Sequence, residues 1–231
     1  ICRYVMASHN PQEHLFDKHI QSVKELIEKF VTSVVYGGDY ITAEAEIINY
    51  LTDMYSESFL GEVDYILDVL GYNVTPQNLI EVRNKVDTTA FVRSNRHRLK
   101  DIFRDHRKSI QKLVEDNRDT MSKEDILNTY WSNIDRLAIS EVQMGIEKAS
   151  VQSSKLFEDV TGVKLLKTWN AIGDDKTCPI CRAMDGLTIP VTESFQAVAP
   201  SASISEELSY TGGDIVYAHP RCRCWVTYSE A

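Results

Sequence analysis

The stretch "KTCPICRAMDG", residues 176–186, places two cysteines three positions apart around a proline. The stretch "AHPRCRCWV", residues 218–226, repeats this layout, with His219 in the first position and Cys222 in the last, and it adds Cys224. Four of the five cysteines of the chain therefore lie in two short segments that are far apart in the sequence. Such doubled pairs are typical of a site that ties distant segments together.

Zinc prefers four thiolate or imidazole ligands in a tetrahedron, and two residues at C-x2-C spacing can bind one ion from a single turn. The pair Cys178 and Cys181 has this spacing, and the pair His219 and Cys222 has it again. The sequence therefore predicts one structural Zn²⁺ site with these four ligands. Cys224 is a fifth candidate, since alternate residues of a strand share a face. It either replaces Cys222 as a ligand or packs behind the site.

Other interpretations of the cysteines explain less. Isolated cysteines are commonly small buried apolar residues, and one Cys-x-x-Cys is compatible with a redox pair, but neither requires a matching His-x-x-Cys. A zinc deaminase needs His-x-Glu ahead of its cysteines, whereas His219 follows them here. Phosphate-binding and dinucleotide-binding glycine loops are absent as well. We therefore expect no enzymatic activity and no small-molecule substrate. The odd cysteine count indicates reduced thiols and a reducing cytosol.

Helical patterns occupy the first two thirds of the chain. Apolar residues at helical spacing fill 19–35, and Gly37-Gly38 ends this pattern. A second helix is expected after Thr42, a third over 62–71, and a fourth with Thr75 as N-cap and proline as its first residue. Ser122 and Asp125 form a capping box that opens the last long helix. We expect this helix to end before Gly162 and its Tyr130 and Trp131 to lie in the apolar core of the protein.

The sequence changes character after Gly162. Residues 163–169 and 215–228 are rich in β-branched and aromatic residues, which predicts short strands. The predicted fold class is α+β, with a helical region over 1–160 and a small zinc-stapled β-rich unit over 161–231. A unit of that size holds only a thin apolar core and commonly needs a staple. Trp169 and Trp225 are expected to cover the zinc site.

Charge is distributed unevenly over an acidic chain of net charge −9. Basic residues exceed acidic ones over 93–118, a predicted helix, and we expect His97 and His106 on its surface. The candidate residues for contacting a protein partner or DNA are Arg93, Arg96, Arg98, Lys100, Arg104, Arg107 and Lys108. This permits a second hypothesis, a zinc-containing nucleic-acid-binding module that uses this helix. Against it, residues 151–231 hold ten acidic and seven basic residues, whereas a zinc module that reads DNA concentrates positive charge on its own unit. No run is long and apolar enough to predict a membrane span.

The cysteine motif, with its neighbours, resembles the C-terminal motif of tailed-phage minor head proteins, the head morphogenesis family of the phage Mu F-like type. The residues that carry the resemblance are Trp169, Asp174, Asp175, Lys176, Thr177, Cys178, Cys181, Asp185, Gly186, His219, Pro220, Cys222, Arg223 and Cys224. Residues 137–141 match a helical element of that family more weakly. Lys176 and Ile139 stand where the family has arginines, and the spacer before His219 is long.

The resemblance implies a non-catalytic virion component inside the capsid near the portal vertex, present in the host cytoplasm during assembly. It implies the portal protein as a partner, with the major capsid or scaffold protein as further partners. It also implies a role in head assembly and in DNA packaging or delivery.

Overall fold

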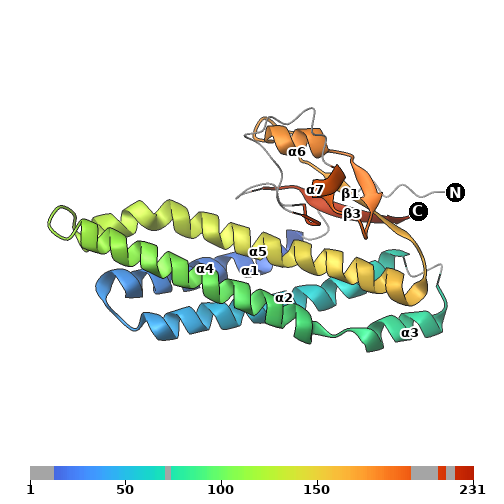
Figure 1. Ribbon diagram of the computed structural model, residues 1–231, viewed down its shortest axis with the longest axis horizontal. Helices are drawn as coiled ribbons and strands as arrows, with labels where there is room; N and C mark the ends of the chain where they lie inside the picture. Colours follow the sequence, from blue (N-terminus) through green and yellow to red (C-terminus); the bar gives the residue numbers. More distant parts are fainter. Residues whose placement is uncertain (1–12, 71–73, 199–212, 217–221) are drawn as a thin grey trace.

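Long helices lie along one another in an elongated bundle, and a small sheet with two short helices lies against one side of it (Figure 1). The structure is a computed structural model that describes residues 13–70, 74–198, 213–216 and 222–231. The helices of the bundle region are α1 (Glu13–Tyr36), α2 (Tyr40–Leu70), α3 (Pro76–Lys85), α4 (Thr88–Asp116) and α5 (Lys123–Thr161). The expected order, with helices first and strands near the C-terminus, is confirmed: the chain is mostly helical, and a small antiparallel sheet follows the bundle.

Local signals in the sequence fix several helix ends. Thr75 caps α3 by accepting a hydrogen bond from the backbone N–H of Asn78, and Pro76 follows at the first helical position. The predicted capping box of Ser122 and Asp125 opens α5. Gly162 ends α5 with φ of 74°, a left-handed conformation that glycine adopts without strain. These boundaries were predictable because they depend only on neighbouring residues.

The predicted second and third helices are a single helix, α2. It begins at Tyr40, where Asp39 and not Thr42 caps the end by accepting the backbone N–H of Thr42. The helix continues through Ser58 and Phe59 because both are buried, and the hydroxyl of Ser153 on α5 donates to the carbonyl of Phe59. Tertiary packing thus carries the helix through a segment that has little apolar periodicity of its own.

The bundle has an apolar core to which α1, α2, α4 and α5 all contribute. Phe30 and Phe103 meet edge to face at its centre, with ring centroids 5.5 Å apart. Tyr130 lies in this core as expected, but the prediction for Trp131 is wrong: it is 46% exposed. His106 is half-buried, not on the surface, and its ring lies 2.6 Å from the hydroxyl of Tyr130.

In the C-terminal part, the described residues form an antiparallel sheet of three strands in the order β2-β1-β3. Its elements are β1 (Leu165–Asn170), α6 (Pro179–Met184), β2 (Thr188–Pro190), α7 (Phe195–Val198) and β3 (Trp225–Glu230). The strand predicted over 163–169 is confirmed as β1. Of the strand predicted over 215–228, only the end forms β3; residues 215–216 form a bend, and 217–221 lie outside the described residues.

A second apolar core crosses the division predicted near residue 160. It joins Trp169, Ile189 and Val226 of the sheet to Ile66 on α2 and Phe157 on α5. The change from helix to strand occurs at the predicted position. The apolar core of the sheet, however, includes side chains from the ends of α2 and α5. The sheet and the bundle are therefore packed together through shared apolar side chains.

Candidate metal centre

Three buried thiols meet where the sheet faces α6. The sulfur atoms of Cys181, Cys222 and Cys224 all lie within 4.8 Å of one another. The Sγ atoms of Cys181 and Cys222 are 3.6 Å apart. Zn–S bonds of about 2.3 Å in a tetrahedron place sulfur atoms roughly 3.8 Å apart, so this spacing suits thiolate ligands of one ion. The three cysteines can hold a metal ion.

Two separate parts of the chain position the thiols. Cys181 lies on the first turn of α6, whose N-cap is Cys178 and whose first residue is Pro179. Cys222 and Cys224 directly precede β3, which pairs along β1 from Asn170–Trp225 to Leu165–Glu230. Because β1 also leads into the loop that carries α6, strand pairing brings both cysteine segments to one end of the sheet.

The structure brings together three of the five predicted ligands. Cys178 is half-buried and lies outside the three-thiol group, although its sulfur accepts the backbone N–H of Cys181 at 3.3 Å. His219 lies outside the described residues. Both Cys222 and Cys224 belong to the group. The sequence offered them as alternatives for one ligand position, and the structure places both beside Cys181.

Burial and mutual contact favour the protonated forms of Cys181 and Cys224. The hydrogen bonds of Cys181 with Cys222 and Cys224, together with burial, raise its pKa. The hydrogen bond from Cys181 lowers the pKa of Cys224, but contact with Cys222 and burial outweigh it, and the net shift is upward. Three buried thiolates without a cation would repel one another strongly. A bound metal cation reverses this, because it favours deprotonated sulfur.

An ion pair between Arg223 and Asp174 links the two cysteine segments. Arg223, between Cys222 and Cys224, donates to both carboxylate oxygens of Asp174 at 2.7 and 2.8 Å. This pairing is bidentate, the geometry that a guanidinium and a carboxylate favour. Asp174 also accepts from the hydroxyl of Thr177 at 3.0 Å, so it orders the loop ahead of α6 as well. The Arg223 contact, followed by that of Thr177, lowers the pKa of Asp174 to about 2.

Two aromatic residues, Trp169 and Phe195, share the apolar core that contains the thiols. Trp169 is fully buried, and its ring meets that of Phe195 edge to face at 5.3 Å between centroids. A hydrogen bond from its side chain acts on Cys224 and lowers the pKa of that thiol. The predicted position of Trp169 beside the site agrees with these contacts. Trp225 is half-buried at the start of β3.

Two buried carboxyl groups near the thiols were missed in the sequence. Glu62 on α2 and Glu147 on α5 are 3% and 1% exposed. Burial, the charge of Glu62 and the charge of Cys222 raise the pKa of Glu147 well above its usual value. The sequence signal was weak: each glutamate occupies a position of its helix that faces the core, where an apolar residue is the usual expectation.

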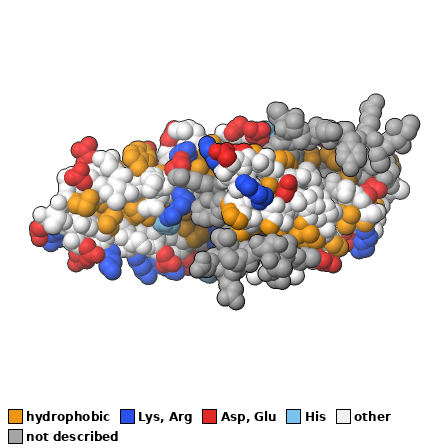
Figure 2. Space-filling view, turned by 90° about the horizontal axis from the view of Figure 1, so that it is seen from above, with side chains coloured by type: hydrophobic (Ala, Val, Ile, Leu, Met, Phe, Trp, Pro, Cys, Tyr) orange, Lys and Arg blue, Asp and Glu red, His pale blue; other side chains and the backbone are white. Residues whose placement is uncertain are grey.

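Several residues of the basic helix are engaged inside the protein. Arg98 donates to both carboxylate oxygens of the buried Glu141 and to the hydroxyl of Tyr55. Arg107 pairs with Glu44 on α2 at 2.5 Å. The other candidates on α4 divide between contacts and exposure: Arg96 donates to Asn49, Arg104 pairs with Asp101 and Asp105, and Arg93, Lys100 and Lys108 are exposed. On the face shown in Figure 2, basic and acidic side chains are interspersed.

Similarity to known proteins and the apolarity of the helices were compared over the whole chain and over the described helices, respectively. Comparisons of the chain with protein-family models, with curated proteins and with solved structures found no match. In the part of the chain that the structure describes, none of the helices has the length and apolarity needed to cross a bilayer.

Proposed function

We propose that the thiol cluster holds one structural zinc ion, which fastens the C-terminal sheet to the loop that carries α6. The ligands would be Cys181, Cys222 and Cys224, completed by Cys178 or His219. Zinc fits this donor set because thiolates are among its preferred ligands, and the burial of three of the four cysteines suits a structural site. The ion would act by stabilising the fold and not by catalysis.

We further propose that the chain is a minor head protein of a tailed phage, which works by binding other head proteins near the portal. One observation supports this most. Residues of the phage-like motif are in contact with one another: Asp174 with Arg223, Cys181 with Cys222, and Trp169 with Cys224. The cysteine contact is expected of any zinc site, whereas Asp174, Arg223 and Trp169 belong to the motif without being proposed ligands.

The alternative, a nucleic-acid-binding module that uses α4, has less support. Arg98 and Arg107, two of its basic residues, are engaged with Glu141 and Glu44. A DNA-binding surface needs several lysines and arginines directed at phosphates. A steep loss of DNA affinity as salt concentration rises would favour this alternative over the phage-head proposal.

Copurification tests the proposal directly. The tagged chain, expressed with the head genes of its phage, is expected to retain the portal protein, and the same purification without the portal gene provides the control. Cys181→Ser should lower portal recovery if the zinc-fastened unit shapes the binding surface. Recovery of assembled heads that contain portal but not this chain would contradict the proposal.

A further inference from the structure

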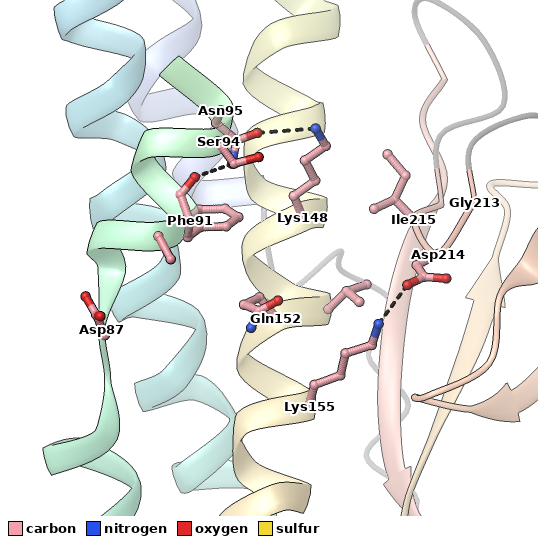
Figure 3. Close-up of a pocket in the computed structure, with 12 residues that line it drawn as sticks. Asp87, Phe91, Ser94, Asn95, Lys148, Gln152, Lys155, Gly213, Asp214 and Ile215 are labelled. Carbon is pink, nitrogen blue, oxygen red and sulfur yellow. Dashed lines mark hydrogen bonds and ion pairs between the residues drawn. The ribbon is translucent and has the colours of Figure 1, made fainter. Parts of the chain in front are cut away.

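A pocket of about 670 Å³ lies between the bundle and residues 213–215, and its described lining contains none of the clustered cysteines. Phe91, Ser94 and Asn95 project into it from α4, and Lys148 and Lys155 project from α5 (Figure 3). Asp214 and Ile215 face them from the C-terminal side. The volume falls within the range of roughly 300–1,000 Å³ that is common for small-ligand sites.

The charged groups of the pocket are not equivalent. Lys155 is paired with Asp214 at 2.7 Å. Asp87 caps α4 by accepting the backbone N–H of Thr89. Lys148 makes no salt bridge with a described residue; its ammonium donates to the side-chain oxygen of Asn95 at 3.2 Å. The pocket therefore contains one ammonium group without an anionic partner among the described residues.

Lys148 is held in place for binding. The amide of Asn95 is fixed because its nitrogen donates to the carbonyl of Phe91 at 2.9 Å, which leaves its oxygen for Lys148. An ammonium has three N–H donors, and this contact uses one. Burial, with the charge of Arg98 adding and that of Glu141 opposing, lowers the pKa of Lys148 to about 8. An incoming anion would offset this cost of a poorly solvated positive charge.

The composition of the lining limits the ligand. Phe91, Val151 and Ile215 offer apolar surface, and Ser94 and Gln152 offer further hydrogen-bond donors. Asp214 is paired with Lys155, so the carboxylate of Asp87 is the lining charge that opposes an anion, and it would repel a doubly charged phosphate about twice as strongly as a singly charged carboxylate. A single carboxylate matches the charge of Lys148, the lining ammonium that has no anionic partner within the described ranges.

We propose that this pocket binds a ligand that carries one carboxylate beside an apolar body, with the ammonium of Lys148 as the counter-ion of the carboxylate. Two sources share this chemistry: a free organic acid and the C-terminus of a polypeptide that ends in an apolar residue. The described lining of this pocket shares no residue with the three-thiol cluster, and the inference stands without the proposed phage function.

The test is a titration of the ¹⁵N-labelled full chain, followed by NMR amide shifts, with hexanoate and with its neutral isostere hexanamide. Hexanoate is expected to bind saturably with Kd on the order of 1 mM, the affinity that a ligand of this size can reach, and to shift amides of α4 and α5 around the pocket. Hexanamide should bind at least tenfold more weakly. Equal binding of the two compounds would overturn the proposal, as would tighter binding of inorganic phosphate.

Matched variants assign the effect to the pocket. Lys148→Met keeps the length of the side chain and should weaken hexanoate binding at least tenfold, whereas Lys112→Met, the same change on an exposed part of α4, should leave it unchanged. Ala90→Trp fills part of the pocket and should also block binding. If the fold is intact by NMR and Lys148→Met binds hexanoate as the wild type does, the proposal is wrong.

A peptide arm identifies the source. A short peptide with a free C-terminal leucine is compared with the same peptide amidated at that end. Tighter binding of the free-acid peptide than of hexanoate assigns the pocket to a polypeptide C-terminus, and the reverse order assigns it to a free organic acid.

Discussion

Gly145 allows α5 to approach the ring of Tyr55 on α2 more closely than any side chain would permit. A Cβ atom at this position would lie 2.1 and 2.3 Å from two ring carbons. The ring cannot easily move aside, because Tyr55 is fully buried and its hydroxyl donates to Glu141 at 3.0 Å. One missing methyl group therefore sets the spacing of two long helices.

Gly145→Ala should destabilise the protein by about 1–3 kcal/mol, the usual cost of overpacking a core. Gly61→Ala is the matched control on α2. Within the described part of the chain its Cβ would meet Leu15 alone, at an ordinary contact distance of 3.9 Å, and alanine favours a helix over glycine by up to ~1 kcal/mol. The two free energies of unfolding, measured with urea, should move in opposite directions. Equal changes would show that the close contact at Gly145 is absent.

His106 should make stability depend on pH. Burial, assisted by the charge of Arg136, lowers its pKa below the usual 6.5, while Glu141 and Asp105 oppose this. As the pH falls through 6.5, the unfolded chain binds a proton at His106 before the folded chain does, and the free energy of unfolding decreases. We expect lower stability at pH 5.5 than at pH 7.5.

The measurement is urea unfolding of His106→Gln at both pH values. This variant can keep a polar contact to Tyr130 but does not titrate, so the difference between the two pH values should shrink. It should not vanish, because burial also lowers the pKa of His19. His97→Gln, at an exposed position, should keep the full difference. An unaltered difference in the His106 variant would exclude the assigned cause.

Among the elements, α4 is fastened to its neighbours through charge as well as apolar packing. Arg98 reaches Glu141 on α5 and Tyr55 on α2, and the side chain of Glu141 is only 3% exposed. The positive charges of α4 are therefore partly a device for holding the bundle together. A charge count from the sequence alone could not separate these residues from exposed ones.

Arg98→Met should cost roughly 3 kcal/mol, since removing one partner of a buried pair leaves the other charge unpaired. Arg104→Met is the control, because Arg104 pairs with Asp101 at the surface, where such pairs contribute at most about 1 kcal/mol. Denaturant midpoints of the two variants report the difference. A change in the free energy of unfolding of Arg98→Met as small as that of Arg104→Met would contradict a structural role for Arg98.

How far the sequence predicts each element depends on how local its cause is. The ends of α3 and α5 follow from caps within a few residues of the chain, and both were predicted. The continuity of α2 depends on packing against Ser153 of α5, which no local pattern contains. In the same way, spacing predicted a cysteine site but could not show that Cys224 joins Cys181 and Cys222 while Cys178 lies beside them.

The molecule as a whole is joined at two levels. A shared apolar core packs the sheet against the ends of α2 and α5, and the thiol cluster brings the two cysteine segments together where a bound metal ion would fasten them. The apolar core depends on the buried area and the fit of its side chains, whereas the link through the thiols would need a bound cation. Loss of metal should therefore loosen the C-terminal part first and the far end of the bundle least.

Cys181→Ser or treatment with a chelator should speed amide hydrogen exchange in β1, α6 and β3, and to a smaller degree at the adjoining end of α5. Exchange in α1 and in the first half of α5 should stay slow, because these segments belong to the separate bundle core. Mass spectrometry of exchanged peptides measures both regions in one sample. Uniform loosening of the entire chain would contradict the two-core arrangement.

We propose that a zinc ion, bound by the clustered cysteine sulfur atoms, stabilises the C-terminal part. X-ray absorption at the zinc edge, on the purified full chain, measures both the metal and its ligands. We expect about one zinc per chain with at least three sulfur neighbours at roughly 2.3 Å; a fourth sulfur indicates Cys178, and one nitrogen indicates His219. A chain without bound zinc, or zinc surrounded only by oxygen and nitrogen, would contradict this.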